Sequence, residues 1–139
     1  MKKINLIIEN EQNNTLNDFQ NLTIEQLNTI FPCSVSILYT GNINVIPSEH
    51  VQSLLDAMVD KVSPGGQIVF GLINYKKTCY AYINGGIDEN AFFAQIKKIN
   101  NRINIVDIAQ YCQKTQKINL SEAKKNNDII TVTLTKVGI

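Results

Sequence analysis

The sequence is poor in the residue types that most often carry chemistry. Its 139 residues include one histidine, three cysteines and no tryptophan. With His50 alone, a metal site or proton relay built on two histidines is excluded. Cys33, Cys79 and Cys112 are odd in number and contain no Cys-x-x-Cys spacing, so we expect neither a zinc site nor a disulfide framework. The thiols are expected to be reduced and at least partly buried.

Long apolar runs and net charge are missing as well. No stretch approaches the roughly 20 apolar residues that span a membrane. The run from Ile4 to Ile8 is interrupted by Asn5 and ended by Glu9, so it is too short for a secretory signal. The formal net charge of +1 gives no field that would attract nucleic acid or an anionic membrane. We therefore expect a soluble, cytoplasmic protein with no membrane partner.

Hydrophobic residues make up 44% of the chain, which is enough for one closed core at this length. No linker or repeat divides the sequence, so residues 1–139 are expected to form a single domain. Basic charge is almost entirely lysine, with Arg102 the only arginine, and isoleucine and asparagine are abundant. This bias is typical of AT-rich coding sequences such as those of many phages. A viral protein, located in the host cytoplasm or the virion, is one expectation.

The middle of the chain has the pattern of a strand, a crossover helix and a second strand. Ser34 to Thr40 is apolar and β-branched, Ser48 to Val62 is amphipathic with helical spacing, and Gln67 to Ile73 is again apolar. The turn Ser63-Pro64-Gly65-Gly66 separates the helix from the second strand, because proline presets a negative φ and glycine accepts a positive one. This unit predicts an α/β fold built on a mostly parallel sheet.

Shorter elements are predicted on both sides of this unit. A β-like opening covers Lys3 to Glu9, and Thr23 with Gln26 has the spacing of a capping box for a short helix that ends before Pro32. The pattern from Tyr75 to Tyr82 fits no element clearly. Later elements are helices over Ile87 to Asn100, with Phe92, Phe93, Ile96 and Ile99 inward, and over Ile105 to Lys114, then antiparallel strands over Lys117 to Ala123 and Ile129 to Val137.

Residues 34–137 resemble the second half of a class I S-adenosylmethionine-dependent methyltransferase. A strand ends in Tyr39-Thr40-Gly41-Asn42, and Val45-Ile46-Pro47 precedes a helix. Lys61-Val62-Ser63-Pro64-Gly65-Gly66 then leads into the strand Gln67-Ile68-Val69-Phe70. Helices followed by a closing antiparallel hairpin also look like that family. The resemblance implies a Rossmann-like fold, with a mostly parallel sheet flanked by helices and a C-terminal antiparallel hairpin.

The sequence departs from that family where the cofactor would bind. The family holds its cofactor with a glycine-rich loop after the first strand and an acidic residue after the next strand. Here Glu9-Asn10-Glu11-Gln12-Asn13-Asn14 follows the first strand, and no glycine precedes Gly41. Too little chain precedes Ser34 for the family's first three strands and their helices. We therefore expect a shortened, degenerate domain without a bound cofactor.

Any small-molecule pocket is expected beyond the carboxyl ends of the parallel strands. Among the residues at those positions, Asn42 and Tyr75 are suited to orient a polar ligand. None of them supplies an evident nucleophile or strong base, so no catalytic residue is assigned, and His50 is expected at the surface in the first turn of its helix. The candidate binding residues are Glu9, Thr40, Gly41, Asn42 and Tyr75.

These observations favour a non-catalytic, methyltransferase-like module with a structural or accessory role, including a phage or virion-associated one. A shortened fold leaves apolar surface to be covered, so a protein partner or a homo-oligomer is expected. One alternative is a minimal S-adenosylmethionine-dependent methyltransferase with a reduced or shared cofactor site. Another alternative is a protein that binds single-stranded nucleic acid, although the near-neutral net charge argues against it. Its binding residues would be Tyr75, Lys76, Lys77, Tyr80 and Tyr82.

Overall fold

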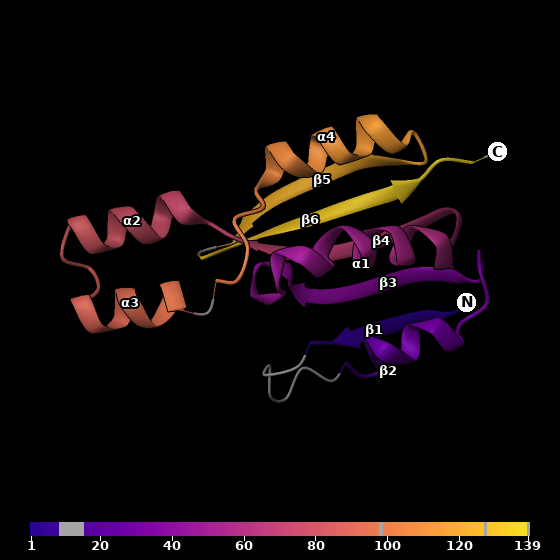
Figure 1. Ribbon diagram of the computed structural model, residues 1–139, viewed down its shortest axis with the longest axis horizontal. Helices are drawn as coiled ribbons and strands as arrows, with labels where there is room; N and C mark the ends of the chain where they lie inside the picture. Colours follow the sequence, from indigo (N-terminus) through magenta and orange to yellow (C-terminus); the bar gives the residue numbers. More distant parts are fainter. Residues whose placement is uncertain (9–15, 98, 127, 139) are drawn as a thin grey trace.

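Six strands form one sheet in the order β2-β1-β3-β4-β6-β5 (Figure 1). This computed structural model describes residues 1–8, 16–97, 99–126 and 128–138. The strands are β1 (Lys3–Ile7), β2 (Gln20–Thr23), β3 (Val35–Asn42), β4 (Val62–Ile73), β5 (Ile118–Asn126) and β6 (Ile129–Lys136). The first four are parallel, and β6 pairs antiparallel with both β4 and β5. The expected mostly parallel sheet with a C-terminal antiparallel pair is therefore confirmed.

Three helical segments cover one face of this sheet. They are the 3-10 helix η1 (Glu25–Thr29), α1 (Ser48–Lys61) and α4 (Ile105–Thr115). A further 3-10 turn, η2 (Ile43–Val45), follows β3 directly. Two crossovers run in the same direction along the sheet, one from β2 through η1 to β3 and one from β3 through α1 to β4. Because such crossovers are right-handed, their helices lie on the same side of the sheet. No described helix is long and apolar enough to cross a membrane.

The core lies between these helices and alternate residues of the strands. One row across the sheet is formed by Ile4, Leu38, Ile68 and Leu134, which pair in sequence from β1 to β6 and are all 0% exposed. Burial of an aliphatic side chain contributes about 1.5–3 kcal/mol, so the four residues of this row contribute about 6–12 kcal/mol. α1 presents the apolar stripe that the sequence predicted, from Val51 to Met58.

The opposite face of the sheet has no such cover over β3, β4 and β6. Its alternate residues are half-buried and lie outside the hydrophobic core, and no helix among the described residues packs on them. We call this set the open face: Ile37, Tyr39, Val69, Thr131, Thr133 and Thr135. Although Ile68 to Ile73 is almost entirely apolar, this strand is covered on one face only, because the described helices that pack on the sheet lie on one side.

Two further helices, α2 (Tyr75–Ile83) and α3 (Glu89–Lys97), form a hairpin that projects beyond the end of the sheet (Figure 1). The rings of Tyr82 and Phe92 hold the two helices together, with centroids 4.3 Å apart. The sequence left α2 unassigned and predicted that the apolar residues of α3 face inward. The second prediction is wrong, since α3 contains no buried residue.

The N-terminal elements also differ from those predicted. β2 is a strand that pairs with β1, and only the five-residue 3-10 helix η1 follows it. Thr23 and Gln26 make half of the predicted capping box, with the Thr23 amide donating to Gln26 Oε1 at 2.9 Å. Cys112 is buried as expected, whereas Cys33 and Cys79 are exposed, which corrects the expectation of partly buried thiols.

Candidate functional site

Two grooves open on the helix-covered side, one along each flank of α1. The η1–α1 groove has a volume of about 880 Å³ and the α1–α4 groove about 700 Å³. Sites for small molecules typically measure about 300–1,000 Å³, so both grooves are large enough. Whether each groove can bind a ligand depends on where it lies relative to the strand ends and on whether its polar groups already bond to the protein.

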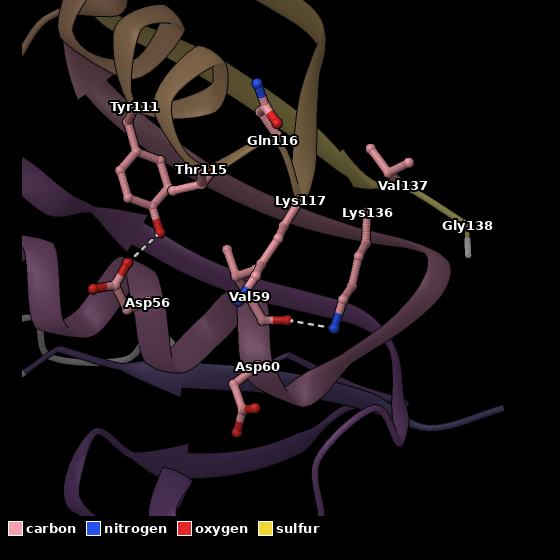
Figure 2. A pocket seen from close by; sticks show the side chains of 10 residues that line it. All are labelled: Asp56, Val59, Asp60, Tyr111, Thr115, Gln116, Lys117, Lys136, Val137 and Gly138. Atoms are coloured by element: carbon pink, nitrogen blue, oxygen red, sulfur yellow. Dashed lines mark hydrogen bonds between the residues drawn. The ribbon is translucent and has the colours of Figure 1, made fainter.

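The α1–α4 groove lies near the start of β4 and the end of β6, at the amino-terminal edge of the parallel strands. Figure 2 shows Tyr111 of α4 pointing at Asp56 of α1, and its hydroxyl donates to Asp56 Oδ1 at 2.6 Å. Lys136 Nζ donates to the carbonyls of Val59 at 2.9 Å and Val62 at 2.8 Å. Carbonyls at a helix C-terminus lack intrahelical partners and attract a cation. The polar groups of this groove therefore join α1, α4 and β6 together.

Alkaline pH is expected to weaken this junction. Burial raises the pKa of Tyr111 well above its ordinary value of 10.0, and the hydrogen bond to Asp56 raises the pKa further. Because the pKa is higher in the folded than in the unfolded chain, this contribution to stability is complete below about pH 10 and is lost as the pH rises towards the folded value. In urea unfolding at pH 8, 9.5 and 11, the free energy of unfolding should fall more steeply for the wild type than for Tyr111→Phe.

The matched control for this measurement is Tyr80→Phe, which removes an exposed tyrosine hydroxyl outside the groove. Its free energy of unfolding should follow the wild-type pH dependence. If the free energy of unfolding fell equally steeply with pH for the wild type and for Tyr111→Phe, the protonated hydroxyl of Tyr111 would make no stabilising contact.

The η1–α1 groove lies at the carboxyl ends of β1 and β2, beside the loop that follows β3. The neighbours of β1 are β2 on one side and β3 on the other, so the strand order reverses here. Open α/β sheets bind ligands at such switch points. Buried apolar side chains form much of its wall, and its polar residues are few: Thr23, Glu25, Asn28, His50, Ser53 and Asn100.

These polar residues do not form a catalytic arrangement. His50 lies in the first turn of α1 as expected, with its side chain 66% exposed and Nε2 3.7 Å from Glu49 Oε1. The Ser53 hydroxyl donates to the backbone carbonyl of His50 at 3.0 Å, so the imidazole does not activate it. Within the described part of the chain, no group of three or more His, Cys, Asp or Glu residues could hold a metal ion.

The predicted binding residues lie elsewhere. Glu9 falls outside the described residues. Thr40 is 1% exposed, and its Oγ1 has no hydrogen-bond partner in the described chain. Gly41 is half-buried near the end of β3. Neither Thr40 nor Gly41 lines either groove.

Asn42 is the last residue of β3 and Tyr75 follows the end of β4 by two residues, and their polar groups bond to the protein itself. Asn42 Oδ1 accepts the Asn44 amide at 2.9 Å, and the Tyr75 hydroxyl donates to the carbonyl of Asn101 at 3.3 Å. Both contacts lead to one pair of asparagines, Asn44 and Asn101, which are 0% and 4% exposed.

The side chain of Asn101 makes every hydrogen bond that an amide can make. Its Nδ2 donates to the carbonyls of Ile43 and Ile46, each at 2.7 Å. Its Oδ1 accepts Asn44 Nδ2 at 3.0 Å and the Ile103 amide at 3.1 Å. Two donors and two lone pairs are thus satisfied by protein groups.

Asn44 completes the network from the other side. Its Oδ1 accepts the amide of Ile73 at the end of β4 at 2.8 Å, and its Nδ2 also donates to the Ile103 carbonyl at 2.9 Å. The loop after β3, the end of β4 and residues 101–103 are therefore fixed to one another. The sequence does not reveal this pair, because its one signal is an asparagine two residues after a strand, and asparagine is also common in loops.

Solved structures with the same fold identify the architecture. The chain is similar to an S-adenosylmethionine-dependent methyltransferase from Archaeoglobus fulgidus, with a TM-score of 0.60 and 12% identity over 97% of this chain and 86% of that one. It is similar to a protein described as an S-adenosylmethionine-dependent methyltransferase from Listeria monocytogenes, with a TM-score of 0.54 and 11% identity over 99% and 81%. The fold is thus the Rossmann-like fold of class I methyltransferases.

Other similar structures are longer than this chain. A protein described as a possible exported protein from Bordetella parapertussis matches with a TM-score of 0.57 and 12% identity over 86% of this chain. The chain spans 45% of that protein's length. It spans 60% of a protein described as a type 11 methyltransferase from Sulfolobus solfataricus, which it matches with a TM-score of 0.53. By sequence, no known protein family and no curated protein matches the chain.

Proposed function

We propose that this chain is a non-catalytic domain with the methyltransferase fold that acts as an interaction module. The observation that carries this proposal is the Asn44–Asn101 network. In open α/β sheets, ligands gather beyond the carboxyl ends of the strands. Here the ends of β3 and β4 meet two buried side chains that bond to the protein itself. Such an arrangement stabilises the loops and leaves the amides of the pair without a free bond for a substrate.

S-adenosylmethionine is the cofactor that the fold implies, and the described residues do not fit it. Nucleotide-type cofactors need glycines that let the backbone approach and a carboxylate for the ribose hydroxyls. β1 ends at Ile7 and is followed by buried Ile8, and no glycine precedes Gly41 in the sequence. β2 ends at Thr23, and the carboxylate that follows is Glu25, an exposed residue of η1. The fit fails after β1, where no glycine lets the backbone approach a ligand, whereas Glu25 does line the η1–α1 groove after β2.

Uncovered apolar surface supports the interaction role. The open face lies over the central strands, and the α2–α3 hairpin carries exposed aromatic and aliphatic side chains. Contiguous apolar surface of this kind marks protein interfaces. A protein partner or an oligomer is therefore part of the proposal. The phage or virion setting, and the cytoplasmic one, stay predictions from the sequence.

Calorimetric titration of the full chain tests the absence of a cofactor. We expect no binding heat with S-adenosylmethionine or S-adenosylhomocysteine up to about 1 mM ligand, which is on the order of a thousand times a dissociation constant of 1 µM. The conditions are those in which an active methyltransferase of this fold binds both. Saturable binding with a micromolar dissociation constant would overturn the non-catalytic proposal.

A minimal methyltransferase is the second candidate, and the η1–α1 groove is the observation that favours it. The groove lies at the switch point and, at about 880 Å³, can hold a nucleoside-sized ligand. This candidate predicts cofactor binding that Ser53→Trp abolishes, because the indole fills the groove from its rim. Gln113→Trp, at an exposed position of α4, is the matched control and should leave that binding unchanged.

A further inference from the structure

The tip of the α2–α3 hairpin contains the only asparagine of the chain that is followed by a glycine. Asn84 is the C-cap of α2, and Gly85 and Gly86 follow it before the chain turns towards α3. All three residues are exposed, and the side chain of Asn84 makes no hydrogen bond within the described residues. Asparagine amides are among the chemically labile groups of proteins, so a free and exposed one at this position can react.

The turn at this tip has the hydrogen bonds of a Schellman motif. Gly85 has a φ of +74°, and its amide donates to the Tyr82 carbonyl at 3.2 Å. The Gly86 amide donates to the Ala81 carbonyl at 2.7 Å. These are the two bonds by which a helix commonly ends at a glycine in the left-handed region. The Gly85 amide is therefore held by the longer of the two bonds.

We propose that Asn84 is a site of self-modification, at which the backbone nitrogen of Gly85 attacks the side-chain amide of Asn84. A bond forms between Gly85 N and Asn84 Cγ, the bond from Cγ to Nδ2 breaks, and ammonia leaves with the Gly85 amide proton. Water then opens the resulting five-membered imide at either of its carbonyls. One opening gives aspartate, and the other gives isoaspartate, in which the chain continues through the side-chain carbon. No oxidant or cofactor takes part, and the site is independent of the proposed function.

The lack of a side chain at Gly85 leaves its nitrogen accessible to Asn84 Cγ. A Cβ at this position would meet no atom within 4 Å, so the surrounding space is open as well. The attack requires the Gly85 amide to leave the Tyr82 carbonyl and the ψ of Asn84 to rotate from its value of 5°. The rate in the folded chain therefore depends on how easily the tip opens.

The packing of the hairpin makes this opening easy. Among the residues of α2 and α3, all of which the structure describes, only Thr78 is buried. The stacked rings of Tyr82 and Phe92 are the ring contact between the two helices. Segments with few buried contacts open locally at a small fraction of the global free energy of unfolding. The tip is thus expected to sample open conformations in which the Gly85 nitrogen is free.

Either product should weaken the end of α2. Aspartate at position 84 places a negative charge at the C-terminal end of the helix, where the helix dipole disfavours it. Isoaspartate adds a methylene to the backbone immediately before Gly85, so the bonds of Gly85 and Gly86 to α2 cannot both form again. The modified chain is therefore expected to have a looser hairpin, and the reaction cannot be reversed by refolding.

Peptide mass mapping of the full chain during incubation at about 37 °C and pH 8 tests the proposal. We expect Asn84 to exchange its amide for an acid at least about tenfold faster than Asn90, because attack within the chain depends on access to the neighbouring nitrogen. Asn90 is the internal control, since it is exposed on the same hairpin but is followed by Ala91. Both aspartate and isoaspartate should appear at position 84, because the imide opens in two ways.

The matched variant is Asn84→Gln, which keeps a side-chain amide but would have to close a six-membered ring. Its tip should stay unmodified, and its urea unfolding should match that of fresh wild type. After equal incubation, hydrogen exchange of the Gly86 amide should be faster in the wild type than in Asn84→Gln. Conversion of Asn84 no faster than Asn90, aspartate without isoaspartate, or equal exchange at Gly86 in spite of complete conversion would each overturn the proposal as stated.

Discussion

Replacing Asn101 with leucine is expected to lower the free energy of unfolding by about 3–5 kcal/mol. The substitution leaves the carbonyls of Ile43 and Ile46 and the amide of Ile103 without the side-chain partners that they have now. Each buried polar group that loses its partner costs about 1–3 kcal/mol, and the losses are not fully additive because the loops can relax. Leucine has the same branching and the same number of side-chain heavy atoms as asparagine, so the substitution leaves no cavity, and the loss combines the broken hydrogen bonds with closer methyl–carbonyl contacts.

Urea unfolding at neutral pH measures this effect, with Asn100→Ala as the matched control. Asn100 is the preceding residue, is exposed, and its side chain makes a single hydrogen bond, from Nδ2 to the Val45 carbonyl at 2.6 Å. Its loss should cost about 1 kcal/mol or less. A similar small loss for Asn101→Leu would show that the network does not stabilise the loops, and the non-catalytic proposal would lose the observation that carries it.

Local patterns in the sequence predicted the elements that pack on the core. The helix at 48–62 was predicted because its apolar residues recur at helical spacing, and α1 buries that stripe. Gln67 to Ile73 was predicted as a strand because it is apolar throughout, and it lies within β4. In both cases the signal is a property of neighbouring residues, which the chain carries before it folds.

Whether a surface is covered by another element is not a local property of the sequence, and the predictions about buried faces failed. The spacing of Phe92, Phe93 and Ile96 correctly indicates a helix, but spacing says only which residues share a face, not what that face meets. Because both ends of the hairpin are fixed at the edge of the sheet, α3 reaches no core. The same reason applies to Val69, whose strand is central while its second face has no helix in the described chain.

The hydrogen-bond partners of the predicted site residues could not be read from the sequence. Asn42 ends β3 and Tyr75 follows β4, and both bond to a pair of asparagines. These asparagines are 57 residues apart, and their bonding depends on the distance and orientation of two loops. A sequence rich in asparagine offers many equivalent candidates for such a pair, so only the tertiary structure selects one.

Replacing Gly66 with alanine is expected to lower the free energy of unfolding by about 2–3 kcal/mol. A Cβ at this position would lie 2.6 Å from Val62 Cγ1, 2.9 Å from the Ser63 carbonyl oxygen and 3.0 Å from the Ser36 carbonyl oxygen. Val62 is fully buried, and two of these contacts are with backbone atoms, so no flexible side chain can give way. The close approach arises where the register between β3 and β4 shifts.

Two other glycines serve as controls for this prediction. Urea unfolding measures the change in the free energy of unfolding for all three glycine-to-alanine variants. Gly65 has a φ of +80° and open space around its Cβ position, so Gly65→Ala should cost about 1–2 kcal/mol through backbone strain alone. Gly138 has open space and no positive φ, so Gly138→Ala should leave stability unchanged. If Gly66→Ala lowered the free energy of unfolding no more than Gly65→Ala, the packing of β3 against this segment would be loose. Residues 63–66, which the sequence predicted as a turn, lie within β4 in the structure, and they would then need the second glycine for some reason other than strand packing.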